Sequence, residues 1–260
     1  FGESTMKALI DKHPVMPPPS LPANSDARPA LIVDMDCVIG CLRSFPKGTS
    51  CGRDGLRAQH LLDALTGEGS VTSTGLLSAI TEVVNLWLGG LCPRVLAEFI
   101  SSAPLTPLLK PDNGIRPIAV GAIWRRLVSK VAMRKVGKEM VKHLGDFQFG
   151  VGTQNGAEAV LHSANRFLSS FHADGSLAML TVDFSNAFNM IDRTALLREV
   201  HQRCPSIYSW VQFLYAQPAR LYVGNDCIGA TTRVQQGGPF RSPPFRLGIT
   251  PYGSPGAREL

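Results

Sequence analysis

The chain has 260 residues, enough for one large domain or two small ones, and its hydrophobic content of 44% is ample for a core. Its net charge of +6 is compatible with a polyanionic partner. The absence of an apolar run of about 18 residues and of a signal-peptide pattern argues against a membrane-bound or secreted protein, so we expect an intracellular one, in the nucleus or cytoplasm.

Two further features concern the chain's origin and its cysteines. Because the first residue is Phe1 rather than Met, we expect a fragment of a longer reading frame. The six cysteines include no pair with the spacing of a zinc knuckle. Cys37 and Cys41 are one helical turn apart, but adding Cys51 and His60 gives an irregular ligand set, so we expect reduced thiols rather than a metal site.

The first third of the chain predicts short helices joined by loops. Residues 1–12 can form a helix, and the proline-rich segment 13–22 must be extended. Asp34 caps a following helical run. A glycine-rich loop at 45–56 then leads into another helix, and residues 76–88 are amphipathic.

The sharpest local signal is a β-hairpin. Apolar runs at 103–109 and 115–120 flank a turn that contains Asn-Gly, the strongest short hairpin signal. Lys110 and Arg116 flank this turn, so both could point to one face near the tip. Such a tip can fold over a triphosphate, because Arg makes a forked contact with phosphate. The alternative is a solvated hairpin with surface charges.

Residues 122–144 predict a long helix with two faces. Apolar residues that repeat every four positions form a stripe that we expect to be buried. Cations repeat at the same interval on the far side: Arg126, Lys130, Arg134, Lys138 and Lys142. A basic stripe of this length suits a nucleic-acid backbone, although a merely solvated face is the alternative.

The stretch 177–193 is the clearest candidate for chemistry. Leu177–Val182 is an apolar run of the length of a buried strand, and it ends at Asp183. A carboxylate at the carboxyl end of a core strand is a common place to hold magnesium, although an Asp that only caps the next turn is the alternative. Helices and then two short strands are expected between Asp192 and Val234.

Four motifs resemble, in their order, those of reverse transcriptases from non-LTR retrotransposons and group II introns. They are the loop with Gly52, Asp54 and Gly55, the hairpin LLKPDNGIRPIAV, the stretch DFSNAF that begins at Asp183, and Gln236-Gly237. The resemblance covers roughly residues 45–237, and plant reverse-transcriptase-like sequences look most similar. It implies an α/β (α+β) fold in which mostly helical fingers with a β-hairpin precede part of a palm.

The resemblance also implies an activity and a metal site. The activity is RNA-directed DNA synthesis by two-metal nucleotidyl transfer, with an RNA template, a DNA primer and a deoxynucleoside triphosphate as partners. Asp183 and the main-chain carbonyl of Phe184 would bind Mg²⁺. Phe188 would stack under the sugar of the incoming nucleotide and exclude a 2′-hydroxyl.

The same resemblance implies four more nucleotide-binding residues. Arg116, with Lys110 as a weaker second, would contact the triphosphate. Gln236 and Gly237 would line the sugar and the base.

The chain departs from the family after Gly237. The family continues with Asp-Pro-Leu, an apolar helix and later a hairpin with two adjacent Asp residues, whereas residues 238–260 contain no Asp-Asp pair and have prolines that exclude such a helix. Two-metal transfer needs carboxylates from both motifs, so we expect the chain as given to be inactive. Residues 239–255 can be encoded by a choice of codons that, when read one nucleotide later, begins Pro-Leu-Gly-Pro-Leu-Leu-Phe. This shifted reading resembles the Pro-Leu and apolar helix of the family, so we expect a frameshift near Gly238.

The expected organisation follows from these motifs. N-terminal helices and a proline-rich arm (1–44) precede the fingers region (45–170), a partial palm (171–237) and a divergent, poorly ordered tail (238–260). Two alternatives to a polymerase are a non-catalytic nucleic-acid-binding remnant that uses only the basic helix and a translated pseudogene with no stable fold.

Overall fold

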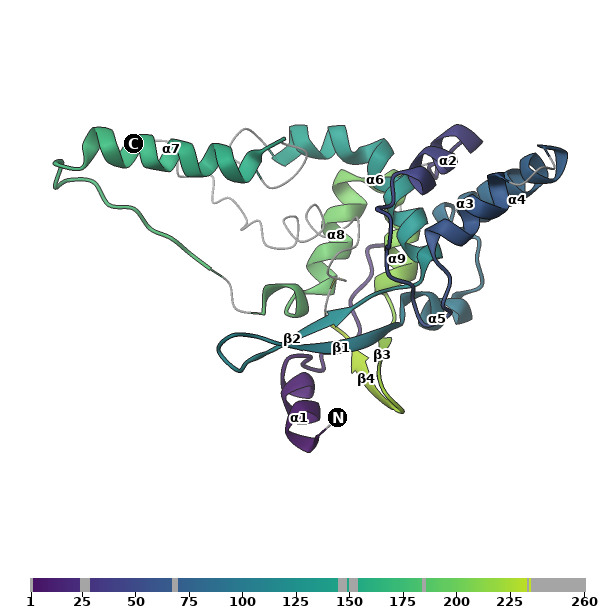
Figure 1. The fold of residues 1–260 in the computed structure, drawn as a ribbon, viewed down its shortest axis with the longest axis horizontal. Coiled ribbons are helices and arrows are strands. Elements are labelled where there is room, and N and C mark those ends of the chain that lie inside the picture. Colours follow the sequence, from purple (N-terminus) through teal and green to yellow (C-terminus); the bar gives the residue numbers. More distant parts are fainter. Residues whose placement is uncertain are drawn as a thin grey trace.

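Helices cover much of one face of a four-stranded sheet in a computed structural model of the chain (Figure 1). The structure describes residues 2–23, 29–66, 70–144, 149, 154–183, 186–232 and 234. The mixed helical and β architecture confirms the predicted α/β (α+β) class. The predicted tail, 238–260, lies outside the described residues.

The helices fall close to where their periodicity predicts them. They are α1 (Glu3–Asp11), α2 (Met35–Arg43), α3 (Ala58–Thr66), α4 (Ser70–Leu88), α5 (Ala97–Ser101), α6 (Ile123–Leu144), α7 (Gly156–Phe171), α8 (Arg193–Arg203) and α9 (Tyr208–Tyr215), with short 3₁₀ helices at Arg94–Leu96, Ala187–Asn189 and Pro205–Ile207. The predicted cap of α2 is confirmed, because the Asp34 carboxylate accepts a hydrogen bond from the Cys37 amide at 2.7 Å.

The sheet joins two hairpins that are distant in the sequence. Its strands are β1 (Ala103–Leu109), β2 (Ile115–Ala119), β3 (Ala219–Val223) and β4 (Asp226–Ala230), in the order β2-β1-β3-β4. The β1–β2 and β3–β4 pairs are antiparallel, which confirms the predicted hairpin, and β1 pairs in parallel with β3 through Ala103 and Pro104. One face of the sheet is buried, with Leu105 and Leu221 on it, while Leu108 and Arg220 on the other are exposed.

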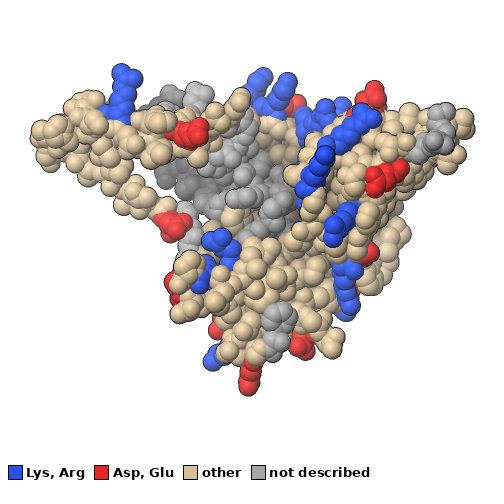
Figure 2. All heavy atoms as spheres, viewed as in Figure 1, with Lys and Arg blue, Asp and Glu red and all other residues tan. Residues whose placement is uncertain are grey.

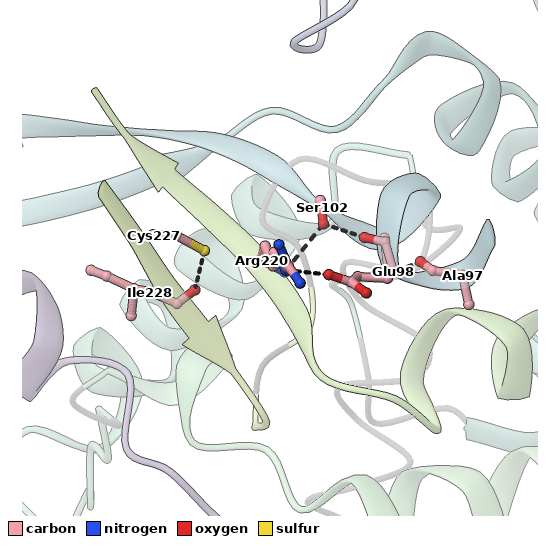
Figure 3. Close-up of polar contacts among 7 residues, drawn as sticks. Ala97, Glu98, Ser102, Arg220, Cys227 and Ile228 are labelled. Atoms are coloured by element: carbon pink, nitrogen blue, oxygen red, sulfur yellow. Dashed lines mark hydrogen bonds and ion pairs between the residues drawn. The ribbon is translucent and has the colours of Figure 1, made fainter. Parts of the chain in front are cut away.

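A polar cluster ties α5 to β3 on the exposed face (Figure 3). The Arg220 guanidinium forms an ion pair with Glu98. The Ser102 hydroxyl donates to the Glu98 carbonyl and accepts a hydrogen bond from the Arg220 amide at 3.1 Å. This cluster fixes the end of α5 against the strand that joins the two hairpins.

The larger core lies between the helices and confirms the predicted apolar stripe of α6. Its fully buried members come from α2, α4, α6, α8 and α9, and they include Val38, Leu42, Val84, Leu88, Leu127, Val131, Leu197, Trp210 and Leu214. By length and composition alone, residues Val71–Leu88 of α4 could cross a membrane, and 28% of this window is buried. A core helix of a soluble protein passes the same test, and Val84 and Leu88 pack in this core.

The glycine-rich loop lies directly against the start of α6. A Cβ atom on Gly52 would lie 2.5 Å from the Ala122 Cα, so only glycine fits there without a shift of the backbone. The Arg126 guanidinium donates to the Ser50 carbonyl, and the Lys130 ammonium donates to the Ser44 carbonyl, both at 2.8 Å. These contacts hold the loop at a fixed position on the helix.

Leu177–Val182 does not form the predicted buried strand. The segment is unpaired and exposed, with 88% of Leu180 and 62% of Val182 accessible. Together with α7 it extends from the body of the molecule as an arm (Figure 1). An apolar run becomes a strand only where a neighbouring strand supplies partners for its main-chain groups, and β1–β4 do not pair with this segment.

Candidate functional site

Asp183, the predicted metal ligand, lies at the end of the exposed arm. Its side chain is open to solvent. Phe184, whose carbonyl is the second predicted ligand, lies outside the described residues. Within the described ranges, no group of three or more His, Cys, Asp or Glu side chains is placed to hold a metal ion. Asp183 therefore offers a single carboxylate.

The turn that follows Asp183 is held by hydrogen bonds. Asn186 adopts a left-handed conformation, with φ of 55°, and its amide group donates to the Lys12 carbonyl at 2.9 Å. The Asn189 side chain donates to the Asn186 side-chain oxygen at 2.7 Å. Phe188, the predicted sugar contact, is half-buried and packs against the larger core. Its ring position is thus fixed from the core side.

The segment that leads to Gln236 meets this turn. The Val234 amide donates to the Phe188 carbonyl at 3.0 Å, and the Thr232 hydroxyl donates to the Asn189 carbonyl at 2.6 Å. Gln236 and Gly237 themselves lie outside the described residues. Val234 is two residues before Gln236. The segment that precedes the last motif is therefore hydrogen-bonded to Phe188, the aromatic residue of the DFSNAF motif.

Lys110 and Arg116 lie on either side of the turn of the β1–β2 hairpin, Lys110 just after β1 and Arg116 in β2. The turn closes with a hydrogen bond of 2.8 Å from the Lys110 amide to the Gly114 carbonyl, and Asn113 takes a φ of 57°. Arg116 pairs with Leu108 and is exposed, whereas Lys110 is half-buried. In the described part of the chain, no hydrogen bond or ion pair joins either cation to Asp183.

The structure divides the predicted basic stripe of α6 into two parts. Arg126 and Lys130 are half-buried against the glycine-rich loop, and burial lowers the pKa of both groups. Arg134, Lys138 and Lys142 are exposed. Figure 2 shows Lys and Arg side chains gathered along the upper edge of the molecule, over α6 and its neighbour α2. Only the second part of the stripe is open to a partner.

Sequence reasoning missed a second set of cations, Arg125 and Arg193, which are both buried beside the ring of Tyr215. One signal was present, because Arg125 lies three residues before Val128, on the apolar side of α6. It also missed that Arg53 of the glycine-rich loop stacks over the Tyr222 ring, 3.9 Å from its centroid.

Comparison with known proteins gives one informative similarity. No family model matches the chain. The chain is 30% identical, over 159 residues, to the retrotransposable element SLACS 132 kDa protein of Trypanosoma brucei gambiense. The aligned region is 61% of this chain and 12% of that protein, so the chain spans only a small part of its relative. This similarity suggests that the chain is derived from a retroelement.

Proposed function

We propose that this chain is the fingers and part of the palm of a retroelement reverse transcriptase domain, and that as given it binds nucleic acid and nucleotide without completing nucleotidyl transfer. The observation that carries the proposal is the hydrogen bond between the Val234 amide and the Phe188 carbonyl. This bond joins the segment that precedes Gln236 to the aromatic residue of the DFSNAF motif, and the resemblance assigns both motifs to one nucleotide site. The similarity to a retrotransposon protein supports the same assignment.

Different residues of this site would contact different parts of the nucleotide. Arg116, which is exposed on β2, and Lys110, at the start of the turn, would contact the triphosphate by charge-assisted hydrogen bonds. Phe188, fixed by the core behind it, would limit the space beside the sugar. By the resemblance, Gln236 and Gly237 would line the sugar and the base.

Magnesium fits the carboxylate of Asp183 as one of its oxygen ligands. Mg²⁺ is commonly bound through one or two protein carboxylates, with substrate phosphates and waters as its other ligands. When bound, it would neutralise charge on the phosphates. Asp183 is exposed, so its carboxylate can reach such an ion.

Nucleotide binding by the 260-residue chain tests the proposal. We expect Mg²⁺-dependent binding of a deoxynucleoside triphosphate, measured by calorimetry, and about 10-fold weaker binding by the Arg116→Ala variant, since a hydrogen bond to a charged group contributes about 1.5–3 kcal/mol. Arg94→Ala is the matched control, because Arg94 is also an exposed arginine. Equal affinities for these two variants would contradict the assignment of Arg116.

A non-catalytic nucleic-acid-binding remnant is the second candidate function. The exposed Arg134, Lys138 and Lys142 favour it, since they need no nucleotide site. Binding of oligonucleotides without binding of nucleotides would select this alternative. A pseudogene product with no stable fold would instead show no cooperative thermal unfolding.

A further inference from the structure

The N-terminal part of the chain lies against both segments that meet at Phe188. Residues 12–22, which we call the N-terminal strap, follow α1 and are rich in proline. The strap forms neither helix nor strand. Its main-chain groups are therefore available to bond with other segments of the fold.

One contact of the strap is with the turn that carries Phe188. The Asn186 amide group donates to the Lys12 carbonyl at 2.9 Å. The oxygen of the same Asn186 side chain accepts a hydrogen bond of 2.7 Å from the side chain of Asn189. Asn189 is 2% exposed, so this second bond reaches the interior. Asn186 thus joins the strap to the buried end of the turn.

A second contact of the strap is with the segment that follows β4. The Thr231 hydroxyl accepts a hydrogen bond of 2.8 Å from the Met16 amide and donates to the Pro14 carbonyl at 3.3 Å. The hydroxyl of the next residue, Thr232, donates to the Asn189 carbonyl at 2.6 Å. The strap, the turn and this segment are therefore joined pairwise, and their hydrogen bonds form a closed ring.

The strap is anchored at both ends and stiff between them. Before it, α1 buries Leu9 completely in a cluster with residues from all four strands of the sheet. Near its far end, the Ser20 amide donates to the Thr194 hydroxyl of α8 at 3.2 Å. Prolines between these points fix the φ angle, which limits the conformations of the strap. A stiff segment that is held at both ends can fix the position of the turn to which it bonds.

Phe188 lies between the two asparagines of this ring of bonds. Its carbonyl accepts a hydrogen bond of 3.0 Å from the Val234 amide, and its side chain packs against the larger core. The main chain at Asn186 is left-handed, with φ of 55°, a conformation that asparagine and glycine adopt most readily. Asn186 therefore suits the backbone of the turn and also supplies its bond to the strap.

We propose that the N-terminal strap sets the position of Phe188, with Asn186 as the positioning residue that connects the two. This inference rests on the proposed function, in which Phe188 limits the space beside the sugar of a nucleotide. A side chain distinguishes a hydroxyl from a hydrogen only when its position is held to within about 0.5 Å. The strap therefore determines how well the site distinguishes a deoxyribonucleotide from a ribonucleotide.

The affinities of the 260-residue chain for dATP and ATP, measured by calorimetry with Mg²⁺, test the proposal. Asn186→Asp keeps the oxygen that accepts from Asn189 but cannot donate to the Lys12 carbonyl, whereas Asn186→Gly keeps the left-handed conformation and removes both bonds. We expect the preference for dATP over ATP to fall by about 3-fold in Asn186→Asp and about 10-fold in Asn186→Gly. A loss of stability alone would weaken the apparent binding of both nucleotides equally and leave their ratio unchanged.

Asn155→Gly is the matched control, because Asn155 is also left-handed, with φ of 54°, and is exposed at the start of α7. It should keep the preference of the unsubstituted chain. If Asn186→Gly fails to fold, Asn186→Asp alone decides the question. An unchanged preference in the Asn186 variants, or equal affinities of the unsubstituted chain for dATP and ATP, would overturn the proposed role in sugar selection.

Hydrogen exchange without nucleotide distinguishes a failure of the strap from a failure of the proposed function. Thr231→Val removes the hydroxyl that bonds to the strap, so exchange of the Asn189 amide should become about 10-fold faster, while the Leu127 amide in the core of α6 keeps its rate. Thr72→Val, at an exposed threonine of α4, is the control and should change neither rate. Faster exchange in a chain that binds no nucleotide would support the strap and reject the proposed function. Unchanged exchange at Asn189 would overturn the strap itself.

Discussion

Gly52 shows how one residue fixes the position of a loop. A Cβ atom there would meet the main chain of Ala122 at 2.5 Å and 2.7 Å, and main-chain atoms cannot rotate away as a side chain can. Gly137, within α6, has no atom within 4 Å of the corresponding position. Only glycine fits at position 52, whereas a larger residue fits at position 137. The sequence alone does not distinguish the two positions.

Substitution of these glycines should change stability in opposite directions. Gly52→Ala should lower the free energy of unfolding by about 1–3 kcal/mol, because it forces the loop from α6. Gly137→Ala should raise it by about 0.5–1 kcal/mol, because alanine is the better helix former. Denaturant unfolding measures both changes. A destabilisation by Gly137→Ala as large as that by Gly52→Ala would contradict the close packing of the loop.

Asp192 is the second carboxylate near the DFSNAF motif, and its role is structural. Its side chain accepts hydrogen bonds from the amides of Thr194 at 2.7 Å and Ala195 at 3.2 Å, so it caps α8. Asp192→Ala should lower the free energy of unfolding by about 0.5–2 kcal/mol, whereas Asp192→Asn should preserve most of the cap. Chemical denaturation of the two variants checks this, and equal losses would mean that the cap contributes nothing.

At the scale of an element, α6 serves as both a core helix and a surface helix. Its inner side supplies Leu127, Val128 and Val131 to the larger core. Its cations do not form one uniform face, since the first two hold the glycine-rich loop and the rest are exposed. Substituting Arg126 or Lys130 would therefore disturb the loop as well as the charge.

Nucleic-acid binding should depend on the exposed cations alone. Changing Arg134, Lys138 and Lys142 together to Glu should weaken binding to an oligonucleotide and reduce the slope of log affinity against log salt by about 2–3, as expected for three lost phosphate contacts. Fluorescence anisotropy at several salt concentrations measures this slope. Glu at Lys7, Arg94 and Arg203, which are exposed on other elements, is the control of equal charge change. Equal slopes for the two triple variants would show that the α6 cations are only solvated.

At the scale of the whole molecule, the residues proposed to bind a nucleotide and the residue proposed to bind a metal differ in their packing. The hairpin and the turn at Phe188 belong to the body of the molecule, with Phe188 supported by the core. Asp183 ends an exposed arm that no strand of the described sheet supports. The part of the site that would bind a nucleotide is therefore better supported than the part that would bind a metal.

This arrangement, with the absence of an Asp-Asp pair from the sequence, predicts that the 260-residue chain does not extend a primer. Two-metal transfer requires carboxylates that hold both ions, and Asp183 supplies one. Incorporation of a labelled nucleotide on an RNA template with a DNA primer is the measurement, with Asp183→Asn as the reference. Incorporation by the unsubstituted chain that is lost in Asp183→Asn would contradict the prediction.

The sequence by itself determined the local elements. The four-residue repeat from Trp124 to Leu144 predicted α6 and its buried stripe, Asp34 predicted a cap, and the Asn-Gly turn predicted the β1–β2 hairpin. These features depend on contacts within a few residues, so periodicity and turn chemistry suffice to find them. The motifs likewise placed candidate residues in order along the chain, but gave no distances between them.

Only the tertiary structure decided which residues meet and which are buried. The apolar composition of Leu177–Val182 predicted a strand, yet pairing depends on a neighbour that periodicity cannot supply. The contact of Val234 with Phe188, the anchoring of Arg126 and the burial of Arg125 beside Arg193 all join segments far apart in the sequence. Charge and hydropathy describe each residue alone, whereas burial depends on what the fold places around it.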